Sequence, residues 1–194
     1  MLGYDWPRLH AALNDLPIAL LLAAVLFDLL ALGTRRESFR LVSFWTLIIG
    51  AVGGVAAVLS GLQAEENISH GDAVHRVMET HELLAFVTLG VFGVLALWRI
   101  LRERRMGSGE RVVGVILSIA GAGVLFATGL YGGRLVFDHA AGIPSEALLG
   151  ELQERNREHS HEAGREHPHP AADSSAGKTA AGHVDPPGTP PHEH

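Results

Sequence analysis

Histidine is the residue type with the clearest chemical potential in this chain. Of the 12 histidines in 194 residues, His10, His81 and His139 stand near the ends of three different apolar segments. Neutral imidazole is a good ligand for haem iron and for zinc, copper or iron ions. Membrane bundles hold cofactors by directing such side chains inward from facing helices. We therefore predict that these three histidines contribute to one cofactor site.

The first form that such a site can take is a b-type haem. This cofactor needs one or two imidazole ligands, a cleft for the porphyrin, and cations near its propionates. We expect His81 and His139 to be the axial ligands, with His10 as an alternate ligand or a neighbour. Arg134 or Arg76 would meet the propionates.

The second form is a transition-metal ion without a porphyrin. Such a site would use His10, His81 and His139, with Asp138 and Glu82 as further oxygen ligands. The alternative without any cofactor treats the histidines as separate residues at the membrane interface.

The C-terminal tail carries a different set of histidines. Two closely spaced pairs, His159 with His161 and His167 with His169, are spaced for weak chelation of zinc, copper or nickel. A metal-handling function, in which the tail collects ions, follows as a third hypothesis.

The elements that must position these residues are four apolar segments, each long enough for a span of about 20 residues. They cover about 9–32, 39–62, 81–101 and 112–137. The fold class is therefore all-α: a polytopic membrane protein with a four-transmembrane-helix bundle over residues 1–144. A short amphipathic helix is expected over 145–158, and 159–194, rich in His, Pro and Ala, is expected to be disordered.

Arginine sets the expected orientation. The connections after the first and third segments carry three and five arginines, whereas the middle connection carries Arg76 alone. The positive-inside rule then places both arginine-rich connections in the cytoplasm and both termini outside. We expect a bacterial inner membrane, with the lipid bilayer and a membrane or periplasmic redox protein as partners. The oligomeric state stays open.

Two further expectations concern helix faces. On a continuous helix His139 would share a face with Thr128 and Gly121, forming a slot of small residues beneath the imidazole. Asp28 lies about two turns before Arg35 and Arg36 and is expected to pair with them at the membrane surface.

Several classes of function are disfavoured. The chain has no cysteine, which excludes disulfides, iron–sulfur clusters held by thiolates and covalently attached haem. It has no basic patch or motif for nucleic acid, no phosphate loop and no serine nucleophile elbow. Whether it is an enzyme stays open, and an electron-transfer or accessory subunit is favoured.

Four short motifs resemble a known family. They are His10 with Leu16-Pro17-Ile18-Ala19-Leu20, then Gly61-Leu62-Gln63-Ala64-Glu65, His81-Glu82-Leu83, and Gly132-Gly133-Arg134-Leu135-Val136-Phe137-Asp138-His139. Over about residues 8–144 the chain resembles a bacterial family of four-helix membrane proteins catalogued as a domain of unknown function. The resemblance implies the four-helix fold and a role for His10, His81 and His139. Its architecture is similar to that of small membrane cytochromes b, by analogy alone. The chain departs from the pattern at Ala140-Ala141-Gly142 and in its long tail.

The leading hypothesis is thus a membrane protein that binds a b-type haem, or another metal, near the outer face and takes part in electron transfer. The main alternative is a structural or accessory subunit without a cofactor, whose small-residue helix faces bind neighbouring membrane proteins.

Overall fold

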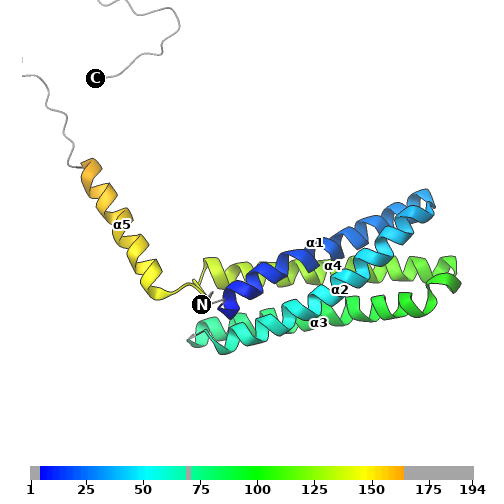
Figure 1. Cartoon of the computed structure of the whole chain (residues 1–194), viewed down its shortest axis with the longest axis horizontal. Coiled ribbons are helices and arrows are strands. Elements are labelled where there is room, and N and C mark those ends of the chain that lie inside the picture. Colours follow the sequence, from blue (N-terminus) through cyan, green and yellow to red (C-terminus); the bar gives the residue numbers. More distant parts are fainter. Residues whose placement is uncertain (1–4, 69–70, 164–194) are drawn as a thin grey trace, which may run out of the picture. The chain divides into compact units, whose positions relative to one another are not determined.

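Four long helices form the body of the protein. The structure, a computed structural model, describes residues 5–68 and 71–163. The helices are α1 (Trp6–Thr34), α2 (Glu37–Glu66), α3 (Asp72–Arg102) and α4 (Ser108–Phe137), which lie lengthwise beside one another (Figure 1). All four are long and apolar enough to cross a membrane. This confirms the predicted four-helix membrane fold.

The first hairpin joins α1 to α2 through a very short connection. The side chain of Asp5 accepts a hydrogen bond from the backbone N–H of Arg8 at 3.0 Å, and Pro7 lies in the first turn, where its missing N–H costs nothing. At the other end of α1, Arg35 adopts a left-handed φ of 57°. This residue and Arg36 reverse the chain, so the two helices must be antiparallel neighbours.

The second hairpin joins α3 to α4 through the 3₁₀ turn η1 (Glu103–Arg105). Helix α3 begins at Asp72, nine residues before the predicted boundary at residue 81. Residues 72–80 are helical but carry many polar side chains, so hydropathy does not reveal them. Helix α4 begins with a capping contact in which the Glu110 carboxylate accepts from the backbone N–H of Gly107 at 3.0 Å.

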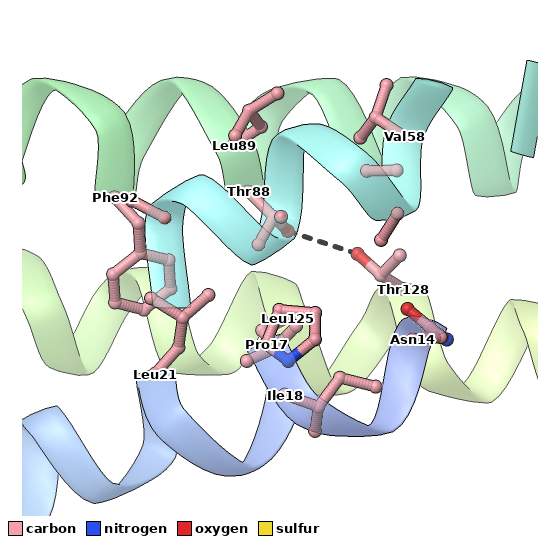
Figure 2. A pocket seen from close by; sticks show the side chains of 14 residues that line it. Asn14, Pro17, Ile18, Leu21, Val58, Thr88, Leu89, Phe92, Leu125 and Thr128 are labelled. Atoms are coloured by element: carbon pink, nitrogen blue, oxygen red, sulfur yellow. Dashed lines mark hydrogen bonds between the residues drawn. The ribbon is translucent and has the colours of Figure 1, made fainter. Parts of the chain in front are cut away.

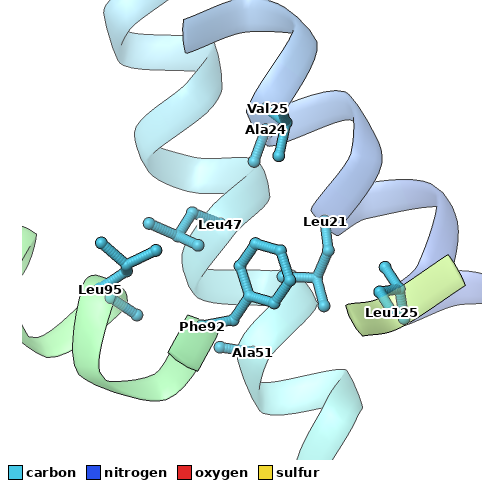
Figure 3. Packing of buried hydrophobic residues seen from close by; sticks show 9 residues of the cluster. Leu21, Ala24, Val25, Leu47, Ala51, Phe92, Leu95 and Leu125 are labelled. Carbon is cyan, nitrogen blue, oxygen red and sulfur yellow. The ribbon is translucent and has the colours of Figure 1, made fainter. Parts of the chain in front are cut away.

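Side chains from all four helices meet in the bundle core. Phe92 of α3 is completely buried and lies between Leu21 of α1, Ala51 of α2 and Leu125 of α4 (Figure 3). Many large apolar side chains instead face outward, including Ile49, Val94 and Phe126. The bundle is therefore apolar inside and outside, as expected for a body surrounded by lipid.

Glycine allows the helices to approach closely at two equivalent places. A Cβ atom at Gly50 would lie 2.9 Å from Leu21 Cδ2, and one at Gly121 would lie 2.9 Å from Val91 Cγ1 and 3.1 Å from Phe92. Neither position has room for a side chain, so these glycines set the distance between helices within each hairpin.

The two hairpins are structural repeats of each other, displaced by 71 positions in the sequence. The offset relates His10 to His81, Asp28 to Arg99, Arg40 to Arg111, Gly50 to Gly121 and Gly61 to Gly132. Two of these pairs contact each other directly: the rings of His10 and His81, and the side chains of Asp28 and Arg99. Equivalent residues meet in this way only near a two-fold axis. An approximate two-fold axis therefore passes through both pairs.

The two ends of the bundle are named here after the residues that lie at them. The histidine end is the end at which His10 and His81 lie. The arginine end is the opposite one, at which both hairpins reverse through Arg35–Arg36 and η1.

Helix α5 (Ser145–Ala163) follows the bundle in the sequence and is described by itself. It begins at the expected position and runs five residues past the predicted end at 158. Leu148, Leu149 and Leu152 are its exposed large apolar residues.

Candidate functional site

His10 is held in a defined position near the start of α1. Its Nδ1 lies 2.9 Å from the carbonyl oxygen of Ala57 and 3.2 Å from Ser60 Oγ, both on α2. The half-buried ring rests on Gly61, where a Cβ atom would lie 3.0 Å from His10 Cε1. The imidazole is therefore fixed from two sides by the backbone of the neighbouring helix.

His81 has the equivalent environment in the second hairpin. Its Nδ1 lies 2.9 Å from the carbonyl oxygen of Thr128 on α4, and a Cβ atom at Gly132 would lie 3.1 Å from His81 Cε1. In both hairpins 47 positions separate the histidine from the residue whose carbonyl it contacts. The repeat thus reproduces the histidine, its carbonyl partner and its glycine.

The carbonyl contacts decide which ring nitrogen is available. A carbonyl oxygen only accepts hydrogen bonds, so Nδ1 of each histidine must carry the proton and donate it. In a neutral imidazole this leaves the lone pair on Nε2. Metal-binding histidines typically donate their second ring nitrogen to such an acceptor. In both histidines Nδ1 is thus engaged by a backbone carbonyl, and Nε2 is the nitrogen that carries the lone pair.

The two imidazoles meet edge to face across the approximate two-fold axis. Their centroids are 6.4 Å apart and their planes are inclined by 81°. The rings come from different hairpins, so this pair joins the two halves of the bundle.

A small cavity of about 50 Å³ lies within the same bundle, between the two hairpins. Side chains from all four helices line it, including Asn14, Pro17, Thr88 and Thr128 (Figure 2). The hydroxyl groups of Thr88 and Thr128 form a hydrogen bond of 3.1 Å. Thr128 thus contacts His81 through its carbonyl and Thr88 through its side chain.

His139 does not join the pair. Helix α4 ends at Phe137, and Ala140 takes a left-handed φ of 51° while Ala141 N–H donates to the carbonyl of Leu135 at 2.8 Å. The chain thus leaves the helix through a left-handed residue and a hydrogen bond between residues six positions apart, and His139 lies in an exposed position. The face on which His139 was expected does point inward, since Gly121, Thr128 and Leu135 are buried, but the helix stops before reaching the histidine.

Arg134 is exposed, and its guanidinium lies 5.1 Å from the ring centroid of Tyr131, a cation–π contact. Within the residues that the structure describes, no group of three or more His, Asp, Glu or Cys side chains is close enough to hold a metal ion. Of the three histidines predicted to share a site, His10 and His81 lie together and His139 does not.

The tail histidines add little here. His159 and His161 fall within α5, and His167 and His169 lie outside the described residues. Chelation by these residues stays a prediction.

A second polar constellation, near the arginine end, was not foreseen. Asp28 does not pair with Arg35 or Arg36: its carboxylate binds Arg99 at 2.6 Å and accepts a hydrogen bond from Ser43 Oγ at 2.5 Å. Asp28, Ser43 and Arg99 are all buried. The expectation was wrong because the partner comes from the other hairpin, and the 71-residue repeat is the sequence signal that points to it.

Comparison with known proteins agrees with this architecture. A family model described as "Predicted membrane protein (DUF2231)" matches residues 7–144. No curated protein and no solved structure gives a match. The match spans the whole four-helix bundle with both histidines of the pair, and the chain therefore belongs to this family of predicted membrane proteins.

Proposed function

We propose that this membrane protein binds a transition-metal centre, the iron of a b-type haem, through His10 and His81, and that it takes part in electron transfer. The observation that carries the proposal is the pair itself: two imidazoles on different hairpins, 6.4 Å apart, each with Nδ1 directed at a backbone carbonyl.

The separation of the rings suits a shared metal. With metal–nitrogen bonds of about 2.0 Å, two imidazoles on opposite sides of one metal have ring centroids about 6.3 Å apart. The pair already has this separation.

The backbone partners would tune the ligands. The carbonyl oxygens of Ala57 and Thr128 accept from Nδ1–H and so make Nε2 a stronger electron donor. Gly61 and Gly132 let each ring lie directly against a helix backbone and limit its rotation. Haem bound in this way would supply reversible one-electron chemistry.

The two imidazoles are suitable ligands for haem iron, but the space between the helices is too small for a porphyrin. The cavity of about 50 Å³ is far smaller than a porphyrin. The space beside Gly61 and Gly132 is already filled by the imidazoles of His10 and His81. The hairpins, however, pack more loosely on each other than their own helices do. A haem at this seam would be held by one histidine from each hairpin, His10 and His81, and would require the hairpins to separate further. Arg134, two residues after Gly132, is the candidate cation for a propionate.

Orientation completes the proposal. By the positive-inside rule the arginine end faces the cytoplasm of a bacterial inner membrane. The histidine pair then lies near the outer face, where a membrane or periplasmic redox protein would exchange electrons with it.

The test is an absorption spectrum of the full chain, purified in detergent after expression with sufficient haem. We expect a Soret band whose position changes on dithionite reduction. His10→Ala and His81→Ala should each abolish or shift it, while His139→Ala, which removes an exposed histidine, should leave it unchanged.

The other outcomes separate the alternatives. If no Soret band forms but elemental analysis finds one metal ion per chain that His10→Ala removes, the pair binds an ion without a porphyrin. If neither haem nor metal is retained, the proposal fails, and a structural or accessory subunit becomes the better reading.

A further inference from the structure

A large cavity opens at the arginine end of the bundle, far along the axis from the histidine pair. It has a volume of about 370 Å³ and is lined by residues of α1, α2, α3, η1 and α4. No step of the proposed electron transfer uses it. Its lining is strongly charged, and two of the charged residues, Asp28 and Arg99, are buried within the bundle.

Positive charge is in excess in this cavity. Four arginines, Arg35, Arg40, Arg99 and Arg111, face only two carboxylates, those of Asp28 and Glu103. The lining therefore carries two positive charges more than negative ones.

The pairing of these groups shows where the excess lies. Arg99 is neutralised by Asp28 at 2.6 Å. Glu103 is shared, since Arg40 binds it at 3.2 Å and Arg111 binds the same oxygen at 3.3 Å. The Arg35 side chain has no hydrogen bond or ion pair with any residue that the structure describes. One guanidinium is thus unpaired and two divide a single carboxylate.

The remaining lining is apolar. Ala31 and Leu32 of α1 and Val112 and Val115 of α4 border the same cavity, and Leu32 and Val112 are also exposed on the bundle surface. The first residue of α4, Ser108, lines it too, which adds the positive end of a long helix dipole. The cavity thus combines a cationic part with an apolar border at a membrane-facing position.

We infer that this cavity binds a phosphate group, supplied as the headgroup of an anionic phospholipid. Guanidinium groups are well suited to phosphate oxygens, and basic pockets between transmembrane helices bind anionic headgroups. A phosphodiester headgroup carries one negative charge, which the excess of two positive charges in the lining would fully neutralise, and the apolar border suits an acyl chain. A free phosphate ion would share the cationic part but would make no use of Leu32 or Val112.

The test measures thermal unfolding of the full chain in neutral detergent against increasing concentrations of three separate additives: phosphatidylglycerol, phosphatidylcholine and inorganic phosphate. Phosphatidylglycerol should raise the unfolding temperature in a saturable manner, and phosphatidylcholine should not. A saturable rise with inorganic phosphate equal to that with the lipid would support a phosphate site whose source is the free ion. Equal stabilisation by phosphatidylcholine would overturn the inference.

Two variants locate the effect. Arg35→Asn removes the unpaired guanidinium while keeping a residue type that tolerates the left-handed backbone, and Arg111→Gln leaves Arg40 to pair with Glu103. Each should weaken the apparent affinity for phosphatidylglycerol about fivefold, the factor for one lost cation near a headgroup.

Arg36→Asn is the matched control, because it makes the same change in the adjacent residue, which does not line the cavity. The inference is wrong if this control weakens binding as much as Arg35→Asn does, or if neither cavity variant weakens it.

Discussion

Asp28 and Arg99 occupy equivalent positions in the two hairpins and bind each other at 2.6 Å across the approximate two-fold axis. The side chains are only 7% and 10% exposed, and Ser43 donates to the same carboxylate oxygen. A buried charge without a partner is strongly destabilising, so each of these two residues needs the other as its counter-charge. The ion pair therefore joins the hairpins at one level, as the histidine pair does at another.

Removing one member of this ion pair should destabilise the bundle strongly. Asp28→Asn leaves the Arg99 guanidinium buried without a counter-charge, a change that costs about 3–5 kcal/mol. Thermal unfolding in detergent should show a large decrease for this variant and for Arg99→Gln. The exposed Asp15→Asn, on the same helix, is the control and should unfold near the wild-type temperature.

The double variant Asp28→Leu/Arg99→Leu should be more stable than either variant that removes one charge alone, because it buries no unpaired charge. A double variant as unstable as the single ones would show that the pair does not act through charge compensation.

Adding a methyl group beside either imidazole should disturb the histidine pair. In Gly132→Ala the new Cβ atom would lie 3.1 Å from His81 Cε1, and in Gly61→Ala it would lie 3.0 Å from His10 Cε1. We expect overpacking to cost about 1–3 kcal/mol and, if haem is bound, to reduce haem content or shift the Soret band.

Gly133→Ala is the control for these variants, because a Cβ atom there meets nothing within 4 Å. It should leave the spectrum unchanged and stabilise helix α4 slightly. Equal effects of Gly132→Ala and Gly133→Ala would argue against a role for the glycine next to the ring.

Close packing of α3 on α4 should depend on Gly121. A Cβ atom at this position would lie 2.9 Å from Val91 Cγ1, so Gly121→Ala must displace Val91 or the helix that carries it and should lower stability by about 1–3 kcal/mol. Gly123→Ala on the same helix has open space and should be neutral or stabilising. Thermal unfolding of the two variants measures the difference directly.

The proposed orientation can be tested by labelling, since the chain has no cysteine of its own. A membrane-impermeant maleimide added to intact spheroplasts should label Asn67→Cys, at the histidine end, but not Arg36→Cys, at the arginine end. After detergent lysis both variants should react. Labelling of Arg36→Cys alone in intact spheroplasts would reverse the orientation.

The bundle should not depend on the C-terminal tail. The compact unit that contains the four helices ends at Leu149, so a chain truncated after Arg157 should unfold at the same temperature as the full chain. If haem is bound, its spectrum should also be retained. Altered metal tolerance of cells that express the truncated chain would support metal capture by the tail, whereas unchanged tolerance would remove that hypothesis.

The sequence by itself determined the four-helix architecture and the residues with chemical potential. Spans are readable because about 20 consecutive apolar residues have few alternatives to a membrane helix. Short connections then make consecutive helices antiparallel neighbours. His10 and His81 stand out for a similarly local reason, since ionisable side chains are rare within membrane segments.

Only the tertiary structure decided which of these residues meet. Apolar side chains surround all four helices, so the inward face of each cannot be identified from hydropathy. The partner of His81 depended on where α4 ends: Ala140 adopts a left-handed conformation that pattern alone did not suggest, and His139 is turned outward. The partner of Asp28 depended on packing between residues 71 positions apart, which made Arg99 its neighbour although Arg35 is much closer in sequence. Helix rotation and the contact between hairpins, both non-local properties, select His10 with His81 and Asp28 with Arg99.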